Sequence, residues 1–236
     1  VTIFDKLIPG QPQEIEFEED DLKLLLILAQ QTAISLENAR LFEEVNDLFL
    51  SSIRSLAETI DAKDPYTHGH VERVTKTVLV IAGEMGLSEE QKKEIEIGAI
   101  LHDIGKIGVK DAVLSKPAQL TPEEKEMLDQ HPDIGSKIMG PIQQLENMIP
   151  LIRHHHESYD GNGYPDRLKG EEIPLGARMI AVADTFDAMT SDRPYRKALP
   201  DSVARAEINK LSGKQFDPKI VDAFNKAYTK GKIHKA

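Results

Sequence analysis

The sequence predicts an all-α protein, in which a helical domain follows one long connecting helix. Three observations support this fold class. No proline or glycine interrupts residues 21–64, and apolar residues recur there mostly at steps of three, four or seven. Helix-start signals follow at Ser88, Thr121 and Asp217. Beyond residues 1–4, no stretch alternates between apolar and polar residues as a half-exposed strand would.

The N-terminal part is expected to form a short β segment at residues 1–4, a turn and an acidic lead-in. From Asp21 to about residue 60 we expect one helix. Its apolar stripe is formed by Ile34, Leu41, Val45, Leu48, Phe49, Ile53, Leu56 and Ile60. Charged and amide residues around the stripe favour a coiled-coil seam over residues 34–50, and thus a homodimer through this helix. The alternative is one amphipathic helix packed on its own domain.

The chain after Pro65 is expected to be mostly helical. Ser88 with Gln91, and Thr121 with Glu124, match the capping boxes that open helices. Asp217 followed by Pro218 matches an N-cap with proline at the first helical position. Residues 157–175 break the helical pattern and are expected to form an ordered loop, because the following glycines and prolines punctuate them: Gly161, Gly163, Pro165, Gly170 and Pro174.

Composition bounds the class of protein. The 236 residues are 40% hydrophobic and 29% charged, as in a soluble globular chain with one substantial domain and a smaller element. Cysteine is absent, so disulfides and thiolate metal sites are excluded. The longest apolar run, residues 24–29, is far shorter than the roughly 20 residues that span a bilayer. No signal peptide is recognisable at Val1, and we expect a cytoplasmic protein with no membrane partner.

The net charge of −11 argues against extended nucleic acid as a partner. A small anionic ligand would need a local cluster of positive charge. The candidates for that cluster are Lys106, Arg178, Arg193, Arg196 and Lys197.

His102 and Asp103 carry the strongest chemical signal, because they lie in the apolar stretch of residues 99–106. Burying an imidazole beside a carboxylate is costly unless something compensates, and a metal ion compensates both. We expect this stretch to be helical, so that Lys106 shares a face with His102 and points a cation near the same cavity. Further residues of metal-ligand type are His70, His131, His155, His156 and Asp184.

This set exceeds the four ligands of one tetrahedral zinc and predicts two metal ions with Asp103 as the bridging carboxylate. Imidazole and carboxylate suit iron, manganese, zinc or nickel better than calcium or magnesium. The alternative reading is a set of hydrogen-bonded core histidines, with His131 before Pro132 serving only to start a helix. His154 is expected outside the ligand set, because three consecutive side chains cannot all converge.

An ordered series of motifs resembles the HD-GYP family of the HD phosphohydrolase superfamily. The series consists of His102-Asp103 with Gly105-Lys106, then His155-His156-Glu157, Asp160-Gly161 and Gly163-Tyr164-Pro165. The similarity runs from about residue 64 to residue 223, and includes residues 186–190, 193–196 and 216–218.

The resemblance implies an HD-type helical bundle and a metal-dependent phosphodiesterase that hydrolyses the bacterial second messenger cyclic di-GMP. The product would be linear pGpG, which many members hydrolyse further to GMP. A hydroxide bridging two divalent ions, iron or manganese ahead of zinc or nickel, would attack phosphorus. The family's metal ligands fall on His70, His102, Asp103, His131, His155, His156 and Asp184. With Asp103, Lys106 is implied to be catalytic, and the substrate-binding positions are Tyr164, Pro165, Arg193 and Arg196.

Two further points follow from the resemblance. Some relatives hold a third metal with a glutamate four residues before the first histidine, where this chain has Tyr66, so we expect two metals. Asp187, one helical turn after Asp184, is expected to support the ligands from behind.

Residues 15–45 separately resemble the end of a GAF sensory domain. We therefore expect a GAF remnant and the start of a signalling helix at 1–45, and the HD-GYP domain at 46–236.

Two other functions are compatible with these residues. One is a catalytically inactive signalling module that binds a cyclic dinucleotide or a partner protein. The other is a hydrolase of a hybrid cyclic GMP-AMP dinucleotide, because the sequence does not distinguish guanine from adenine recognition. The complete series of ligand-type residues favours an enzyme over the inactive module.

Overall fold

The computed structural model of the chain describes residues 18–63, 69–192 and 196–233. The chain divides into two compact units, Val1–Leu50 and Ser51–Ala236. The expected β segment at residues 1–4, and most of the stretch that precedes the long helix, lie outside the described residues.

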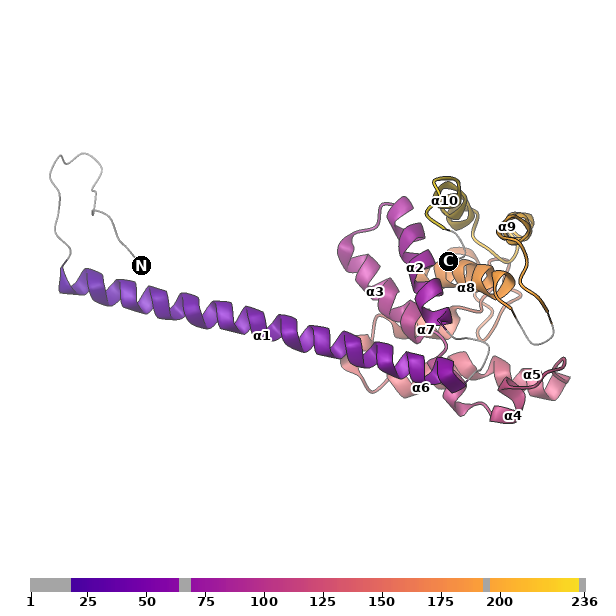
Figure 1. Cartoon of the computed structure of the whole chain (residues 1–236), viewed down its shortest axis with the longest axis horizontal. Helices are drawn as coiled ribbons and strands as arrows, with labels where there is room; N and C mark the ends of the chain where they lie inside the picture. The colour runs from indigo at the N-terminus through magenta and orange to yellow at the C-terminus, as the bar shows by residue number, and fades with distance from the viewer. Residues whose placement is uncertain (1–17, 64–68, 193–195, 234–236) are drawn as a thin grey trace. The chain divides into compact units, whose positions relative to one another are not determined.

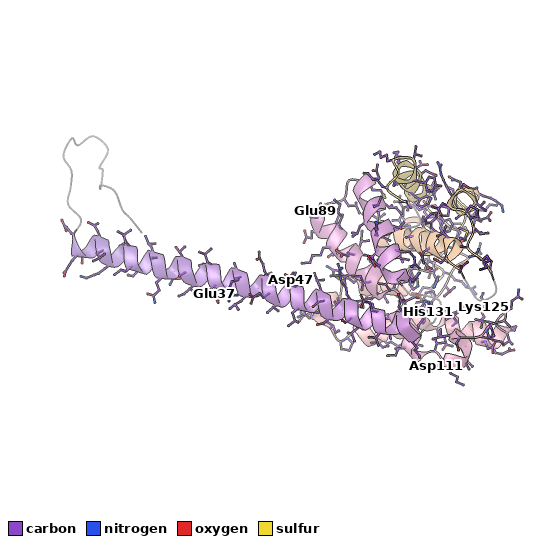
Figure 2. The ribbon with its side chains drawn as sticks, viewed as in Figure 1. Glu37, Asp47, Glu89, Asp111, Lys125 and His131 are labelled. Carbon is purple, nitrogen blue, oxygen red and sulfur yellow. The ribbon has the colours of Figure 1, made fainter. Side chains whose placement is uncertain are left out.

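The helix expected from Asp21 is observed as α1 (Glu19–Lys63), which contains 45 residues. Its first turn carries Glu19, Asp20 and Asp21, whose negative charge stabilises the positive end of the helix dipole. Within the first unit, charged side chains such as Glu37 and Asp47 project from the helix (Figure 2). Apolar side chains are exposed there too, including Ile34, Leu41, Phe42, Val45 and Leu48.

In the part of the second unit that the structure describes, all regular secondary structure is helical, so the all-α prediction is confirmed (Figure 1). It begins with the last residues of α1, which bury Ile53, Ala57 and Ile60. The α-helices that follow are α2 (His70–Glu84), α3 (Glu89–Leu101), α4 (Asp111–Leu114), α5 (Pro122–Asp129), α6 (His131–Met139), α7 (Ile149–His154), α8 (Leu175–Thr190), α9 (Asp201–Lys210) and α10 (Pro218–Thr229). Short 3-10 segments lie between them: η1 (Ile104–Gly108), η2 (Gln143–Leu145) and η3 (Gly170–Glu172).

The expected helix starts are observed. Ser88 and Gln91 form a capping box at the start of α3, in which each side chain bonds the other residue's backbone N–H. Thr121 and Glu124 do the same at the start of α5. Asp217 accepts a hydrogen bond from the backbone N–H of Lys219 at the start of α10. These bonds satisfy donors that a helix N-terminus otherwise leaves unpaired.

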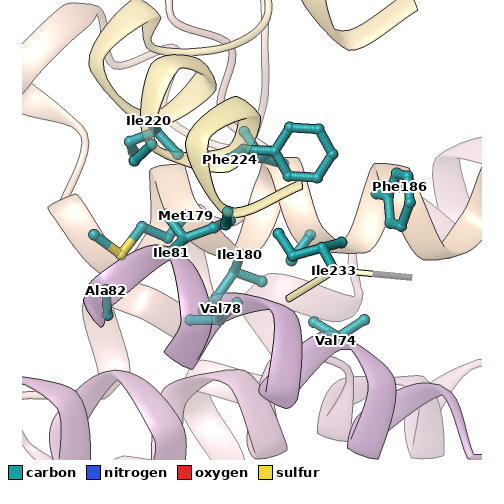
Figure 3. Packing of buried hydrophobic residues seen from close by; sticks show 14 of the residues in the cluster. Val74, Val78, Ile81, Ala82, Met179, Ile180, Phe186, Ile220, Phe224 and Ile233 are labelled. Atoms are coloured by element: carbon teal, nitrogen blue, oxygen red, sulfur yellow. The ribbon is translucent and has the colours of Figure 1, made fainter. Parts of the chain in front are cut away.

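The core lies where α2, α8 and α10 meet (Figure 3). On one face of α2, apolar side chains recur at helical spacing and are fully buried (Val74, Val78 and Ile81), as are Met179 and Ile180 of α8. Prominent members are Val74, Val78, Ile81, Met179, Ile180, Phe186, Ile220 and Phe224. Burial of each large side chain contributes about 1.5–3 kcal/mol, and fixes α2 against α8. These two helices carry His70, Asp184 and Asp187, so the core sets their separation.

The segment between α7 and α8 is irregular apart from the single turn η3, as predicted for residues 157–175. Gly163 lies against the start of this loop, because a Cβ added there would come within 2.2 Å of the Ser158 nitrogen. Gly161 has a φ of 87°, which favours glycine. The loop is therefore folded back on residues 157–158 by backbone contacts that larger residues would prevent.

Two glycines give a matched stability test. A Cβ at Gly105 would lie 1.9 Å from the His131 carbonyl oxygen, whereas a Cβ at Gly83, on the exposed side of α2, would meet nothing within 4 Å. We expect Gly105→Ala to lower the free energy of unfolding by roughly 3 kcal/mol, because η1 and α6 must move apart. Gly83→Ala should raise it by about 0.5–1 kcal/mol through helix propensity. Urea unfolding measures both, and equal effects would contradict the close approach of η1 to α6.

Candidate metal centre

His102 and Asp103 lie at the turn between α3 and η1. The sequence predicted that residues 99–106 form one helix, and this is wrong, because α3 ends at Leu101 and the chain tightens into a 3-10 turn from Ile104. The change follows from the close approach of Gly105 to the α6 backbone. His102 is fully buried and Asp103 is 7% exposed.

Lys106 consequently does not share an α-helical face with His102. Its Nζ instead donates a hydrogen bond to Asp103 Oδ2 at 2.6 Å, and its side chain is 15% exposed. Burial opposes ionisation of Asp103, but Lys106 and the neighbouring histidines outweigh it and hold the pKa of Asp103 well below its usual range. Asp103 is therefore an ionised carboxylate within the protein interior.

The remaining ligand-type residues form two groups. His70, His102 and Asp184 are one group, and His131, His155 and His156 are the other. Within each group, the candidate ligand atoms all lie within 4.8 Å of one another. Each group thus offers three nitrogen or oxygen atoms to one point in space.

Asp103 lies between the two groups and touches both. Its Oδ1 is 3.2 Å from His131 Nε2, and its Oδ2 is 3.4 Å from His102 Nε2 and 3.7 Å from His70 Nε2. One oxygen therefore faces each group, which is the arrangement that a bridging carboxylate requires.

The imidazoles are oriented by helix-terminal carbonyls. His102 Nδ1 donates to Ala99 O at 2.6 Å, and His155 Nδ1 donates to Ile152 O at 2.8 Å. His131, at the start of α6 (Figure 2), donates in the same way to Leu128 O at 2.7 Å. Each acceptor lies three residues back, in the last turn of α3, α5 or α7, where carbonyls lack intrahelical partners. Since Nδ1 carries the proton, Nε2 of each neutral ring presents a lone pair.

The Nε2 atoms of neighbouring rings face one another. His131 Nε2 lies 3.2 Å from His155 Nε2, and His70 Nε2 lies 3.3 Å from His102 Nε2. Burial, reinforced by the neighbouring histidines, lowers the pKa of His102, His155 and His156. Ring nitrogens this close to one another need a proton or a cation between them. The donor set therefore fits divalent metal ions bound through neutral imidazoles and carboxylates.

Tyr164 borders the His131 group. Its ring stacks on that of His156, with centroids 5.0 Å apart and planes inclined by 27°. Burial, together with the nearby carboxylate of Asp129, raises the pKa of Tyr164. Pro165 follows it in the chain and is half-buried. The sequence did not identify Asp129 as a neighbour of Tyr164, because the two residues are 35 positions apart in the chain.

Other predicted cations have roles inside the fold. Arg196 Nη2 donates to the Ala188 carbonyl at 2.5 Å, at the end of α8. Arg178 pairs with the buried carboxylate of Asp217 and donates through Nε to Ile173 O at 2.9 Å. Arg178 therefore does not belong to the expected anion-binding cluster. Arg193 and Tyr66 lie outside the described residues, and Lys197 is exposed.

His154 points away from both groups, and its Nε2 lies 2.9 Å from Asp166 Oδ2. Glu157, which directly follows the two histidines, is buried, and its Oε1 accepts a hydrogen bond from the Asp166 N–H at 2.7 Å. It thereby fixes the loop just after Tyr164 and Pro165. Its position next to the His155-His156 pair is the one sequence signal for this role.

Comparisons with known proteins identify the family of the chain. The family model described as HD domain matches residues 54–220. A Thermotoga maritima protein named cyclic di-GMP phosphodiesterase is 45% identical over 209 residues, which cover 87% of this chain and 55% of that protein. The Xanthomonas campestris pv. campestris cyclic di-GMP phosphodiesterase response regulator RpfG is 40% identical over 231 residues. These residues cover 94% of this chain and 61% of that protein. The chain thus spans little more than half the length of these relatives.

A solved structure has the same fold. The Vibrio cholerae cyclic GMP-AMP specific phosphodiesterase V-cGAP3 matches with a TM-score of 0.60 at 21% identity, over 75% of this chain and 48% of that one. None of the helices in the described part of this chain combines the length and apolarity that a bilayer crossing needs. The family match, which covers most of the second unit and both groups of histidines, establishes that the chain belongs to the HD-domain family.

Proposed function

We propose that the protein is a metal-dependent phosphodiesterase that opens cyclic di-GMP to linear pGpG. The observation that carries this proposal is the convergence of two groups of imidazole and carboxylate ligands on Asp103. The names of the relatives from Thermotoga and Xanthomonas supply the substrate. Water would add to phosphorus, the P–O3′ bond would break, and the 3′ oxygen would leave with a proton. A second hydrolysis would convert pGpG to GMP.

We propose two metal ions, iron or manganese before zinc or nickel. One ion would be held by His70, His102 and Asp184, and the other by His131, His155 and His156. Asp103 would contact both ions. When bound, such ions supply Lewis acidity and lower the pKa of a water nucleophile toward 7. The short distances between facing Nε2 atoms and the ionised state of Asp103 support this ligand assignment.

The protein's own groups would position the substrate. Lys106 places an ammonium beside Asp103 at the edge of the cluster, where it would neutralise charge that develops on the phosphate oxygens. Tyr164 and Pro165 form a wall next to His156, and the nucleotide would lie against this wall. We assign the phosphates of the substrate to Arg193 and Arg196.

A second substrate has a specific observation in its favour. Two Vibrio cholerae relatives, 32% and 35% identical to this chain, are named 3'3'-cGAMP-specific phosphodiesterases 2 and 3. The test is therefore to incubate the full chain, loaded in turn with manganese, iron or zinc, with each dinucleotide, and to separate the products. Hydrolysis of neither one by metal-loaded protein would refute the proposed activity and favour a binding module.

We further propose that residues 1–45 are the end of a GAF domain, and that α1 pairs with the same helix of a second copy. Ile34, Leu41 and Leu48 recur at steps of seven, and each is at least 44% exposed. Asn38 and Val45 fall at the alternate seam position, where one asparagine fixes the register of a parallel pair. A signal from upstream would reach the catalytic domain through this helix.

Asp103→Ala is expected to abolish turnover and to reduce bound metal, because it removes the carboxylate shared by the two groups. Metal content by elemental analysis and product formation by chromatography measure both effects. His154→Ala, outside both groups, is the control and should retain metal and rate. Full metal content in Asp103→Ala would contradict the bridging role.

Lys106→Ala is expected to keep both metals and to lower kcat by about 100–1000-fold, because a charge that stabilises the transition state is lost. Lys110→Ala, an exposed lysine four residues further on, should change neither quantity. If Lys106→Ala released the metals instead, Lys106 would act on the Asp103 carboxylate and not on the substrate phosphate.

Leu41→Glu is expected to convert a dimer to a monomer, because it places a charge in the centre of the proposed seam. Ala39→Glu adds the same charge to an exposed position roughly 200° around the helix and should leave the dimer intact. Sedimentation velocity over a range of concentrations measures the change. A wild-type chain that stays monomeric at the highest concentration would refute the seam.

A further inference from the structure

Arg73 and Asp187 form a charged pair directly behind His70. His70 Nδ1 donates to Asp187 Oδ2 at 2.7 Å. Arg73 holds the same carboxylate through two atoms, Nε to Oδ1 at 2.5 Å and Nη2 to Oδ2 at 3.1 Å. Asp187 is only 5% exposed, so little water reaches its carboxylate. Its charge is therefore balanced mainly by these two neighbours.

The pairing of α2 with α8 produces this arrangement. His70 and Arg73 lie three residues apart on α2, and Asp184 and Asp187 lie three apart on α8. Residues with this spacing share a helix face. His70 Nε2 lies 3.5 Å from Asp184 Oδ1, while the Arg73–Asp187 pair contacts the other side of the ring.

We propose that Arg73 is a positioning residue that sets the metal affinity of the His70 group and leaves that of the His131 group unchanged. The inference rests on the proposed metal centre. The Asp187 hydrogen bond to Nδ1 holds the His70 ring so that Nε2 faces His102 and Asp184. Arg73 in turn contacts both oxygens of Asp187 and holds that carboxylate in one orientation.

The two groups differ in how their histidines are oriented. His131 and His155 donate Nδ1–H to the backbone carbonyls of Leu128 and Ile152, which no side-chain substitution on α2 removes. His70 depends on a side-chain carboxylate, which can rotate away from the ring when its guanidinium partner is removed. The effect of Arg73 should therefore be confined to one of the two groups.

A cavity beside this pair lets water reach it once Arg73 is shortened. The cavity measures about 280 Å³, and Arg73, Lys76, Asp187 and Ser191 are among its lining residues. In Arg73→Ala, water would take the place of the guanidinium and compete with His70 for the carboxylate. Lys76 lines the same cavity from the same helix, three residues further on, which makes Lys76→Ala the matched control.

The experiment is a titration of the metal-free full chain with manganese. Calorimetry measures the heat of each binding step, and electron paramagnetic resonance measures the manganese that stays free. Arg73→Ala is expected to weaken one of two binding steps by about 10–100-fold and to leave the other unchanged. Lys76→Ala should leave both steps unchanged. Arg73→Lys should recover part of the loss, because lysine keeps the charge but contacts the carboxylate at one point.

Two further backgrounds identify the affected group. With Asp184→Ala, which removes a ligand of the His70 group, adding Arg73→Ala should cause no additional loss at the step that remains. With His131→Ala, which removes a ligand of the other group, the 10–100-fold loss should persist. The double-mutant comparison isolates the coupling between Arg73 and the His70 group.

Equal weakening of both steps in Arg73→Ala, or no weakening of either, would overturn the inference. If Arg73→Ala does not fold, Arg73→Lys becomes the test, and it should lose part of the affinity at one binding step. Unchanged metal affinity in Arg73→Lys would then overturn the inference. A wild-type chain that binds no manganese, iron or zinc would instead refute the proposed metal centre, so the two failures are distinguishable.

Discussion

The arrangement of the second unit depends on one electrostatic constraint, which is that an ionised Asp103 lies among imidazole rings in the interior. Its two oxygens lie within 3.2–3.7 Å of three different imidazole nitrogens, and Lys106 contacts it from the edge. A buried carboxylate without such partners would cost several kcal/mol. The partners come from α2, the end of α3, η1 and the start of α6. Stable packing of these segments is thus inseparable from assembly of the ligand cluster.

Helix ends provide the means of assembly. His102 and His155 directly follow helices, and His131 and His70 begin them. Three of the rings use the unpaired carbonyl three residues back in the chain as the acceptor for Nδ1–H, so the backbone of a helix terminus fixes the ring, the tautomer and the direction of Nε2 together. This mechanism needs no side-chain partner. It also explains how short helices such as α5 and α7, with 8 and 6 residues, contribute to the cluster.

Local features of the fold were predictable from the sequence, and long-range ones were not. The capping boxes at Ser88 and Thr121 depend on residues three positions apart, and they are observed as predicted. The end of α3 at Leu101 was missed, because it depends on α6 approaching Gly105 and not on the propensity of residues 102–106. The ligand-type residues were recognisable because polar side chains interrupt apolar stretches. Arg73 was not linked to Asp187, since 114 positions separate them.

The charge balance of the cluster bears on how an acidic chain could attract an anionic substrate. With a net charge of −11, the protein as a whole repels a dinucleotide that carries two phosphates. Among the described residues, three of the cations discussed above already have partners: Lys106 pairs with Asp103, Arg73 with Asp187, and Arg196 with a carbonyl of α8. The proposed ligands include only two carboxylates, Asp103 and Asp184, so two divalent ions would leave the proposed centre with net positive charge. The attraction for phosphate would then arise from the bound ions, and the surrounding arginine and lysine would serve mainly to hold the ligands and orient the substrate.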